Sequence, residues 1–177
     1  MATIRGWIGA SLDSYIATPD EGLEWLTKHD GADLGYDAFI AGIRTVVMGR
    51  ATYDWIERSH YPWLYNGKRA IVVTSRPIDN PKGPLETWSD VDALVAHLRA
   101  LDDGDVWMIG GGKLQQAFIE RGALDRLEIF IVPEIIGGGY PLFPPNGFAR
   151  SVTLRAGNVL RDGIVHLDYE FAPVPAT

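Results

Sequence analysis

Apolar residues in the middle of this chain predict strands and helices in alternation. Runs rich in valine and isoleucine are typical of buried strands, and they cover residues 45–48, 69–75, 106–109 and 127–132. Helices are predicted before or between these runs, at residues 36–41, 51–57, 91–98 and 113–121. This alternation predicts an α/β fold in which a mostly parallel sheet carries helices on both faces.

The two ends of the chain show strand patterns instead. Residues 3–10 form the predicted opening strand, and residues 152–160 and 163–171 form a predicted hairpin. The Asp162-Gly163 dipeptide favours the tight turn between the last two strands. In the final strand, apolar residues occupy alternate positions. The sequence therefore predicts a three-layer α/β/α arrangement that closes with a C-terminal antiparallel hairpin.

The first connection is long and irregular. Residues 18–22 have turn chemistry, and Trp25 follows them. A long loop that carries a large aromatic residue is more often a functional lid than a simple link. Trp25, Tyr53 and Phe143 are candidates for stacking on a flat substrate, and for each of them core or lid packing is the alternative.

Composition narrows the class of protein. The 177 residues are 46% hydrophobic, which is enough for the core of one domain over residues 1–177. No run of about 18 apolar residues exists, so no membrane partner is expected. The N-terminus lacks an apolar signal region, so we expect a cytoplasmic protein. The chain has no cysteine, which excludes disulfides, thiolate metal sites and cysteine nucleophiles.

Net charge and histidine spacing argue against a nucleic-acid site and against a structural metal site. The net charge is -7, and an acidic chain is a poor general binder of nucleic acid. The four histidines do not fall at metal-ligand spacing, so no structural metal is expected. A phosphorylated cofactor remains compatible with the acidic composition, because a few local donors decide its binding.

Three predicted strand ends carry residues suited to a phosphorylated ligand. After the first, Gly49 leads into a helix with Arg50 and Thr52 near its start, where free N–H groups attract anions. An ordinary strand-to-helix turn is the alternative there. After the second come Thr74, Ser75 and Arg76, which suit a 2′-phosphate or a plain polar loop.

The third strand end is rich in glycine. Residues 110–112 are all glycine, and Lys113 and Leu114 follow at the start of a helix. Such a turn lets a pyrophosphate approach the backbone closely, although it is neither G-x-G-x-x-G nor a P-loop. Because ligands of open α/β sheets bind at the carboxyl ends of strands, the three ends together predict one groove for a dinucleotide phosphate.

These segments resemble the dihydrofolate reductase superfamily over nearly the whole chain. The matching motifs are S-L-D-S-Y-I-A at 11–17, V-M-G-R-A-T-Y at 47–53, V-V-T-S-R at 72–76 and M-I-G-G-G-K-L at 108–114. The run at 124–143 is similar to the C-terminal reductase domain of the bacterial riboflavin-pathway deaminase-reductase and to small stand-alone proteins like it. No H-x-E or P-C-x-x-C motif of the deaminase half occurs.

The resemblance implies a dihydrofolate-reductase-like fold, a homodimer and NADPH as the cofactor. It places phosphate at Gly49, Arg50 and Thr52, and the adenosine end with its 2′-phosphate at Thr74, Ser75 and Arg76. It also implies that the pyrophosphate lies against Gly110, Gly111, Gly112, Lys113 and Leu114, and that Ile16 and Ala17 cover the nicotinamide.

The chain departs from the folate enzymes at two places. Those enzymes keep a carboxylate on the helix before the M-G-R strand; Asp33 lies at a comparable offset, and Asp37 one turn later. Either one is a candidate proton donor or a solvated helix residue. Asp13 is a further candidate that equally suits a loop cap. Where the folate enzymes carry a threonine, Val132 offers no hydroxyl.

The sequence thus favours an NADPH-dependent reductase that transfers a hydride to a small heterocyclic or carbonyl-type substrate, similar to 5-amino-6-(5-phosphoribosylamino)uracil reductase. A non-catalytic NADP-binding module and a true dihydrofolate reductase are the alternatives.

Overall fold

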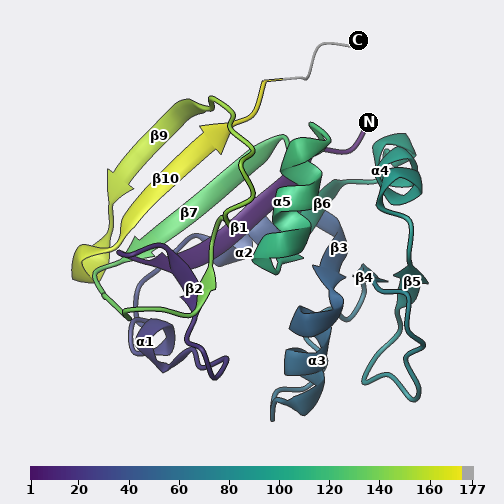
Figure 1. The fold of residues 1–177 in the computed structure, drawn as a ribbon, viewed down its shortest axis with the longest axis horizontal. Coiled ribbons are helices and arrows are strands. Elements are labelled where there is room, and N and C mark those ends of the chain that lie inside the picture. The colour runs from purple at the N-terminus through teal and green to yellow at the C-terminus, as the bar shows by residue number, and fades with distance from the viewer. Residues whose placement is uncertain (173–177) are drawn as a thin grey trace.

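One eight-stranded sheet organises the chain in the computed structural model, which describes residues 1–172. Its strand order is β5-β4-β3-β6-β1-β7-β10-β9. The bounds are β1 Ile4–Ser11, β3 Ile43–Gly49, β4 Arg69–Val73, β5 Glu86–Trp88, β6 Asp105–Gly110, β7 Arg126–Val132, β9 Thr153–Val159 and β10 Val165–Glu170. Neighbours from β5 to β7 run parallel, and β10 pairs antiparallel with both β7 and β9. The predicted mostly parallel sheet with an antiparallel edge is confirmed (Figure 1).

Helices cover both faces of this sheet. One face packs against α2 (Tyr36–Gly42) and α3 (Arg50–Arg58), and the other packs against α4 (Val91–Ala100) and α5 (Gly112–Glu120). Figure 1 shows α5 in front of the sheet and α2 behind it. No helix within residues 1–172 is long and apolar enough to cross a membrane.

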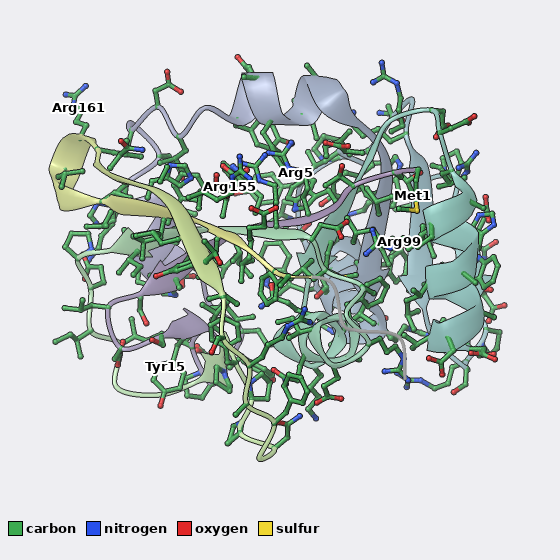
Figure 2. All side chains as sticks on the ribbon, turned by 90° about the horizontal axis from the view of Figure 1, so that it is seen from above. Met1, Arg5, Tyr15, Arg99, Arg155 and Arg161 are labelled. Carbon is green, nitrogen blue, oxygen red and sulfur yellow. The ribbon has the colours of Figure 1, made fainter. Side chains whose placement is uncertain are left out.

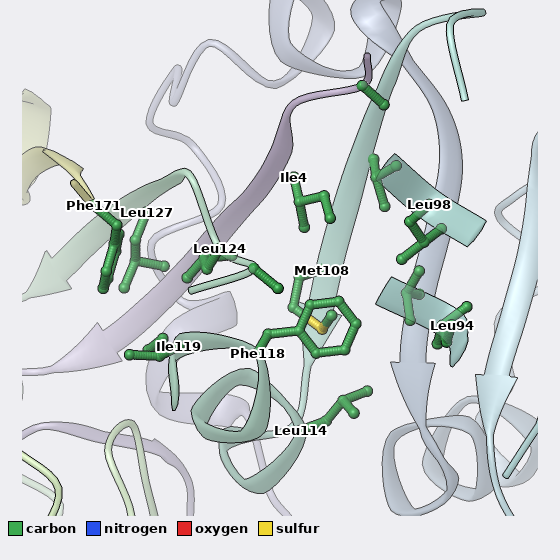
Figure 3. Packing of buried hydrophobic residues seen from close by; sticks show 14 of the residues in the cluster. Ile4, Leu94, Leu98, Met108, Leu114, Phe118, Ile119, Leu124, Leu127 and Phe171 are labelled. Carbon is green, nitrogen blue, oxygen red and sulfur yellow. The ribbon is translucent and has the colours of Figure 1, made fainter. Parts of the chain in front are cut away.

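The largest core lies under α4 and α5. Phe118 of α5 is fully buried, and it packs in one cluster with Met108 of β6 and with Leu94 and Leu98 of α4 (Figure 3). On the opposite face, Met48 of β3 belongs to the cluster that includes α2 and α3. Alternate residues of the central strands thus enter opposite cores, which is why these strands are apolar throughout.

Helix ends follow the chemistry of the sequence closely. The side chain of Asp90 accepts hydrogen bonds from the backbone N–H groups of Asp92 and Ala93 and caps α4. Beyond α5, Gly122 takes a left-handed φ of 62°, as expected for a glycine after a helix. The β9–β10 turn places Asp162 at φ 60° and Gly163 at φ 76°, which confirms the predicted turn.

The first connection contains more structure than the sequence predicts. It holds β2 (Tyr15–Ala17) and a single helical turn, α1 (Glu24–Thr27). β2 pairs antiparallel with β8 (Tyr140–Pro141) in a second, two-stranded sheet. Strands of two or three residues have no measurable periodicity, so the pattern of the chain gave no signal for this pairing.

Candidate active site

The three predicted strand ends lie side by side at one edge of the sheet. β4, β3 and β6 are consecutive neighbours in the strand order, and each pair is parallel. Their carboxyl ends therefore reach the same edge, with the segments after Val73, Gly49 and Gly110 in a row. This is the edge at which open α/β sheets bind ligands.

Two helix N-termini meet at the peptide between Gly110 and Gly111, which is cis. A Cβ atom built on Gly49, which precedes α3, would lie 3.8 Å from both Gly110 O and Gly111 N. A Cβ built on Gly111, which precedes α5, would lie 3.5 Å from the hydroxyl of Thr52. We name Gly49, Thr52 and residues 110–113 the glycine cradle. Both helices direct the positive ends of their dipoles toward it.

The first turn of α5 leaves backbone donors for a ligand. The N–H groups of Leu114 and Gln115 both donate to Gly111 O, at 3.0 and 3.1 Å. The N–H groups of Gly112 and Lys113 come before these two in the helix. The first N–H groups of a helix have no acceptor inside it, so these two can bind a ligand. Lys113 is exposed, whereas the side chain of Leu114 packs into the core. Leu114 therefore contributes packing beneath the cradle.

The β8 segment lies against the same helix start. A Cβ on Gly112 would lie only 2.6 Å from Pro141 O, so this position needs glycine. A Cβ on Gly139 would lie 2.0 Å from Ala17 O. Ile16 and Ala17, predicted to cover the nicotinamide, are thus held in β2 by a backbone contact that only glycine permits.

Arg50 and Arg76 play different structural parts. Arg50 donates from Nε to Asp54 at 2.7 Å, and it donates to the backbone carbonyls of Arg76 and Pro77. It therefore braces the loop after β4. Arg76 is 70% exposed and lies 3.9 Å from Asp54, so its guanidinium can turn to a ligand. The Thr74 hydroxyl accepts from the Arg76 N–H at 3.1 Å and fixes the turn.

A pocket of about 380 Å³ opens beside β1, on the side of the sheet that carries α2. Its aromatic residues are Trp7, Tyr36 and Phe130; the Trp7 ring lies 4.6 Å from the Phe130 ring and 5.5 Å from the Tyr36 ring. We name it the aromatic pocket. A second hollow of about 500 Å³ shares Trp7, Asp33 and Leu34 with it.

Strand register places the aromatic pocket next to the glycine cradle. Gly6 of β1 pairs with Met108 of β6, so the end of β1, which includes Gly9, lies beside the end of β6 at Gly110. Gly9 lines the pocket and pairs with Phe130 of β7. Trp7 and Phe130 are not among the residues that the sequence predicts for the site, because neither lies at a strand end. Their position on one face of adjacent strands was the available signal.

Of the two candidate carboxylates before β3, Asp37 lies on the predicted helix and Asp33 does not. Asp33 lies in the loop before α2 and not on a helix, and its Oδ1 accepts from the Gly35 N–H at 2.9 Å. It is exposed, and it lines both hollows. Asp37 lies in the first turn of α2 and lines the aromatic pocket, as does Val132. The helix starts only at Tyr36, because Asp33 ties down the turn before it.

Asp13 is a loop cap. Its carboxylate accepts from the Ser11 hydroxyl and from the N–H groups of Ile136 and Gly137. The Ser11 hydrogen bond is the main cause that lowers the pKa of Asp13. An acid with a lowered pKa is ionised at neutral pH and has no proton to donate, so the capping alternative is confirmed.

None of the three residues expected to stack on a substrate lines the aromatic pocket. Trp25 is 7% exposed and packs with Phe130 and Ile164, and Tyr53 is 2% exposed inside the α2–α3 core. The hydroxyl of Tyr53 donates to Glu57, and burial raises the pKa of Tyr53 to about 12. Phe143 is exposed, but it follows β8 beside the start of α5. Trp25 and Tyr53 are thus packing residues, because their faces of α1 and α3 point inward.

Comparisons with known proteins agree with this geometry. The family model of the RibD C-terminal domain matches residues 3–165. An uncharacterised Bacillus subtilis protein, YwjB, is 31% identical over 140 residues, which cover 77% of this chain and 80% of the relative. A Shewanella sp. PV-4 protein described for riboflavin biosynthesis has a TM-score of 0.81 at 29% identity, covering 96% of this chain and 98% of its own.

Two more distant structures share the fold. A dihydrofolate reductase of Enterococcus faecalis complexed with NADP(H) has a TM-score of 0.69 at 20% identity, with 95% of both chains covered. A Thermotoga maritima deaminase and 5-amino-6-(5-phosphoribosylamino)uracil reductase has a TM-score of 0.68 at 16% identity. This match covers 98% of the present chain and 57% of that longer chain. The dihydrofolate-reductase-like fold is confirmed.

Proposed function

This chain belongs to the RibD C-terminal domain family, and we propose that it is an NADPH-dependent reductase that transfers a hydride to a small heterocyclic or carbonyl-type substrate. The family and fold are of the oxidoreductase type found in riboflavin and folate reduction. The observation that carries the proposal is the meeting of two helix N-termini at the Gly110–Gly111 peptide, next to an aromatic pocket.

The glycine cradle fits a pyrophosphate. The backbone at Gly110 and Gly111 faces open space, since a Cβ there meets nothing closer than the Thr52 hydroxyl. The N–H groups of Gly112 and Lys113 would donate to phosphate oxygens. Arg76, with Thr74 and Ser75 beside it, would hold the 2′-phosphate of the adenosine end. When bound, NADPH supplies the hydride.

The remaining residues would position the two reactants and exclude water. Ile16 and Ala17 in β2 would cover the nicotinamide, and Trp7 with Phe130 would hold a flat ring in the aromatic pocket. Asp33 is the carboxylate that lines both hollows, so it is our candidate for binding an N–H group of the substrate and handling its proton. Val132 provides no hydroxyl to assist it.

The test is NADPH binding followed by turnover. Titration of the protein with NADPH and with NADH, by quenching of tryptophan fluorescence, should show tighter binding of NADPH. Oxidation of bound NADPH is then followed by absorbance with dihydrofolate, pyrimidines and small carbonyl compounds in turn. Binding with no turnover on any of these substrates would favour a non-catalytic NADP-binding module, and turnover of dihydrofolate alone would favour a dihydrofolate reductase.

We also propose a cytoplasmic homodimer. The edge strand β9 leaves its ladder groups unpaired on one side and carries exposed apolar residues, with Leu154 at 53% and Val159 at 80% exposure. A second copy that covers this edge would bury both. Light scattering at micromolar concentration should give twice the mass of one chain, and a mass near one chain would count against the dimer.

A further inference from the structure

We infer that the aromatic pocket takes a flat ring that is neutral or cationic and carries no phosphate group. The inference rests on the proposed function, because that function puts the substrate in this pocket. It concerns only which substrates the pocket accepts, and it follows from the charges that line it.

The size and walls of the aromatic pocket suit a small ring. Its volume of about 380 Å³ lies at the lower end of the range for small-molecule sites. Trp7 stacks on Phe39 at 5.5 Å with an interplanar angle of 22°, so neighbouring rings hold it in place. Phe130 is itself stacked on His166 at 4.6 Å. The walls are therefore rigid and largely apolar, and a flat heterocycle fits them better than a flexible chain does.

The rim of the aromatic pocket is acidic. Asp30, Asp33 and Asp37 line it and are all exposed. Asp33 already accepts from the Gly35 N–H just before α2, so this donor is not available to an anion. A dianionic phosphate that enters the aromatic pocket would lie close to these three carboxylates, and like charges repel each other at short distances.

The one basic side chain that lines the pocket is already paired. Among the described residues this is His29, whose Nε2 lies 3.1 Å from a carboxylate oxygen of Glu134. Lys28 pairs with the same carboxylate at 2.7 Å. Hydrogen bonds from Lys28 and His29 lower the pKa of Glu134, so this acid remains ionised and keeps both partners.

The adjoining hollow offers no unpaired cation either, within residues 1–172. Arg5 lies 2.6 Å from Glu128 and 3.2 Å from Asp105. His166 lies 3.1 Å from the second oxygen of Glu128. Figure 2 shows Arg5 and Arg155 on the side of the sheet that faces α2, and Arg155 pairs with Glu170. Arg5, His166 and Arg155 therefore each already have a carboxylate partner on the same sheet.

This charge distribution conflicts with a phosphoribosyl substrate. The Thermotoga maritima protein of the same fold is named for reducing 5-amino-6-(5-phosphoribosylamino)uracil. Proteins hold such phosphates with arginine, lysine or free backbone N–H groups. Among residues 1–172, no arginine or lysine lines the aromatic pocket, and Arg5 in the adjoining hollow is paired with Glu128 and Asp105. We therefore expect a substrate of the unphosphorylated class.

The test compares matched probes by quenching of tryptophan fluorescence, since Trp7 lines the pocket. The probes are 2,4-diaminopyrimidine as a cation, uridine as a neutral nucleoside and uridine 5′-monophosphate as its phosphorylated counterpart. We expect the monophosphate to bind at least about tenfold more weakly than uridine, and 2,4-diaminopyrimidine to bind tightest. Equal or tighter binding of the monophosphate would overturn the inference, as would failure of both unphosphorylated probes to bind at millimolar concentration.

Variants that remove rim carboxylates test whether the rim causes the discrimination against phosphate. The double variant Asp30→Asn with Asp37→Asn removes two exposed rim charges whose carboxylates have no hydrogen-bond partner within residues 1–172, so the fold should persist. It should reduce the discrimination between uridine and its monophosphate several-fold. Asp102→Asn is the control for each of the two single variants, Asp30→Asn and Asp37→Asn, because this exposed aspartate follows α4 on the opposite face and should leave the discrimination unchanged. Unchanged discrimination in the double variant would contradict the assignment to the rim.

The outcome is separable from that of the proposed function. NADPH binding is measured in a separate titration, and the probes are tested with and without NADPH. If NADPH does not bind but uridine is still preferred over its monophosphate, the reductase proposal fails and the inference about the pocket holds. If NADPH binds and the monophosphate is preferred, only the inference about the pocket fails.

Discussion

The glycine cradle and the aromatic pocket adjoin each other across β1 and β6, yet they are encoded differently. The cradle consists mainly of backbone: glycines at strand ends and the first N–H groups of α3 and α5. The aromatic pocket consists of side chains from β1, from residues 26–37, from β7 and from Ile164, so parts that are far apart along the chain meet in it. Each part of the cradle is thus visible in a few consecutive residues, whereas the pocket exists only once the strands are in register.

This difference suggests a division of roles. A backbone site binds what all members of a fold share, because glycine and helix dipoles do not depend on the neighbouring side chains. A site made of side chains changes with single substitutions, as the acidic rim of this pocket illustrates. The two regions should therefore respond independently to mutation.

The largest expected effect is that of Gly111→Val on cofactor binding. Gly111 has a φ of -77°, which valine tolerates, and its Cβ would meet only the Thr52 hydroxyl at 3.5 Å. The fold should survive, while the side chain holds phosphate away from two donors. Loss of two charge-assisted hydrogen bonds of about 1.5 kcal/mol each weakens NADPH binding about a hundredfold. Fluorescence titration measures the binding, and circular dichroism measures the fold.

Gly112→Val is the informative partner of that variant. Its Cβ would lie 2.6 Å from the backbone oxygen of Pro141, so we expect a lower melting temperature together with weaker binding. If folded Gly111→Val binds NADPH as tightly as the wild type, the cradle does not hold the cofactor, and the reductase proposal loses its main support.

The next effect concerns the aromatic pocket. Trp7→Ala removes a half-buried ring that packs against Phe39, Tyr36 and Phe130. We expect a loss of about 2 kcal/mol in the free energy of unfolding, less than for a fully buried tryptophan. Binding of 2,4-diaminopyrimidine, followed by calorimetry, should be lost while NADPH affinity stays within about threefold, a factor worth roughly 0.7 kcal/mol. Parallel loss of both ligands would mean that the two regions are not independent.

The same contrast explains what the sequence could predict. Runs such as residues 106–109 and turns such as Asp162-Gly163 predict their elements because the signal is local. Strand order is not local, and no pattern along the chain predicts it. Asp33 precedes the helix predicted at residues 36–41, and its hydrogen bond from the Gly35 N–H, which fixes it in the loop before α2, leaves no trace in periodicity. For Trp25 and Tyr53 the sequence leaves stacking and packing open, because aromatic character alone does not reveal which face of a helix is buried.

A smaller effect should separate NADPH from NADH. Arg76 is 70% exposed and lies on the loop that Arg50 braces. Arg76→Ala should weaken NADPH binding about tenfold to a hundredfold, because one charge-assisted hydrogen bond to phosphate is worth roughly 1.5–3 kcal/mol. NADH affinity should hardly change. Arg161→Ala, at the exposed tip of the β9–β10 turn, removes the same charge elsewhere and serves as the control. If Arg76→Ala loses affinity for NADPH and NADH equally, Arg76 does not bind the 2′-phosphate.

The smallest effect is a pH dependence of the loop between β7 and β8. Asp13 ties this loop to the end of β1 through the N–H groups of Ile136 and Gly137, and its folded-state pKa lies below the ordinary value of 3.8. A group whose pKa is lowered on folding stabilises the fold above its unfolded pKa, and this contribution is lost as the pH falls through the folded pKa. Asp13→Asn should therefore melt below the wild type at about pH 7, and the gap should close as the pH falls below 3.8, the ordinary pKa of this group. Many other carboxylates titrate in this range, so the measured quantity is the difference between the two melting temperatures and not either one alone. A gap that stays constant over the whole range would show that the Asp13 carboxylate does not hold the loop through its charge.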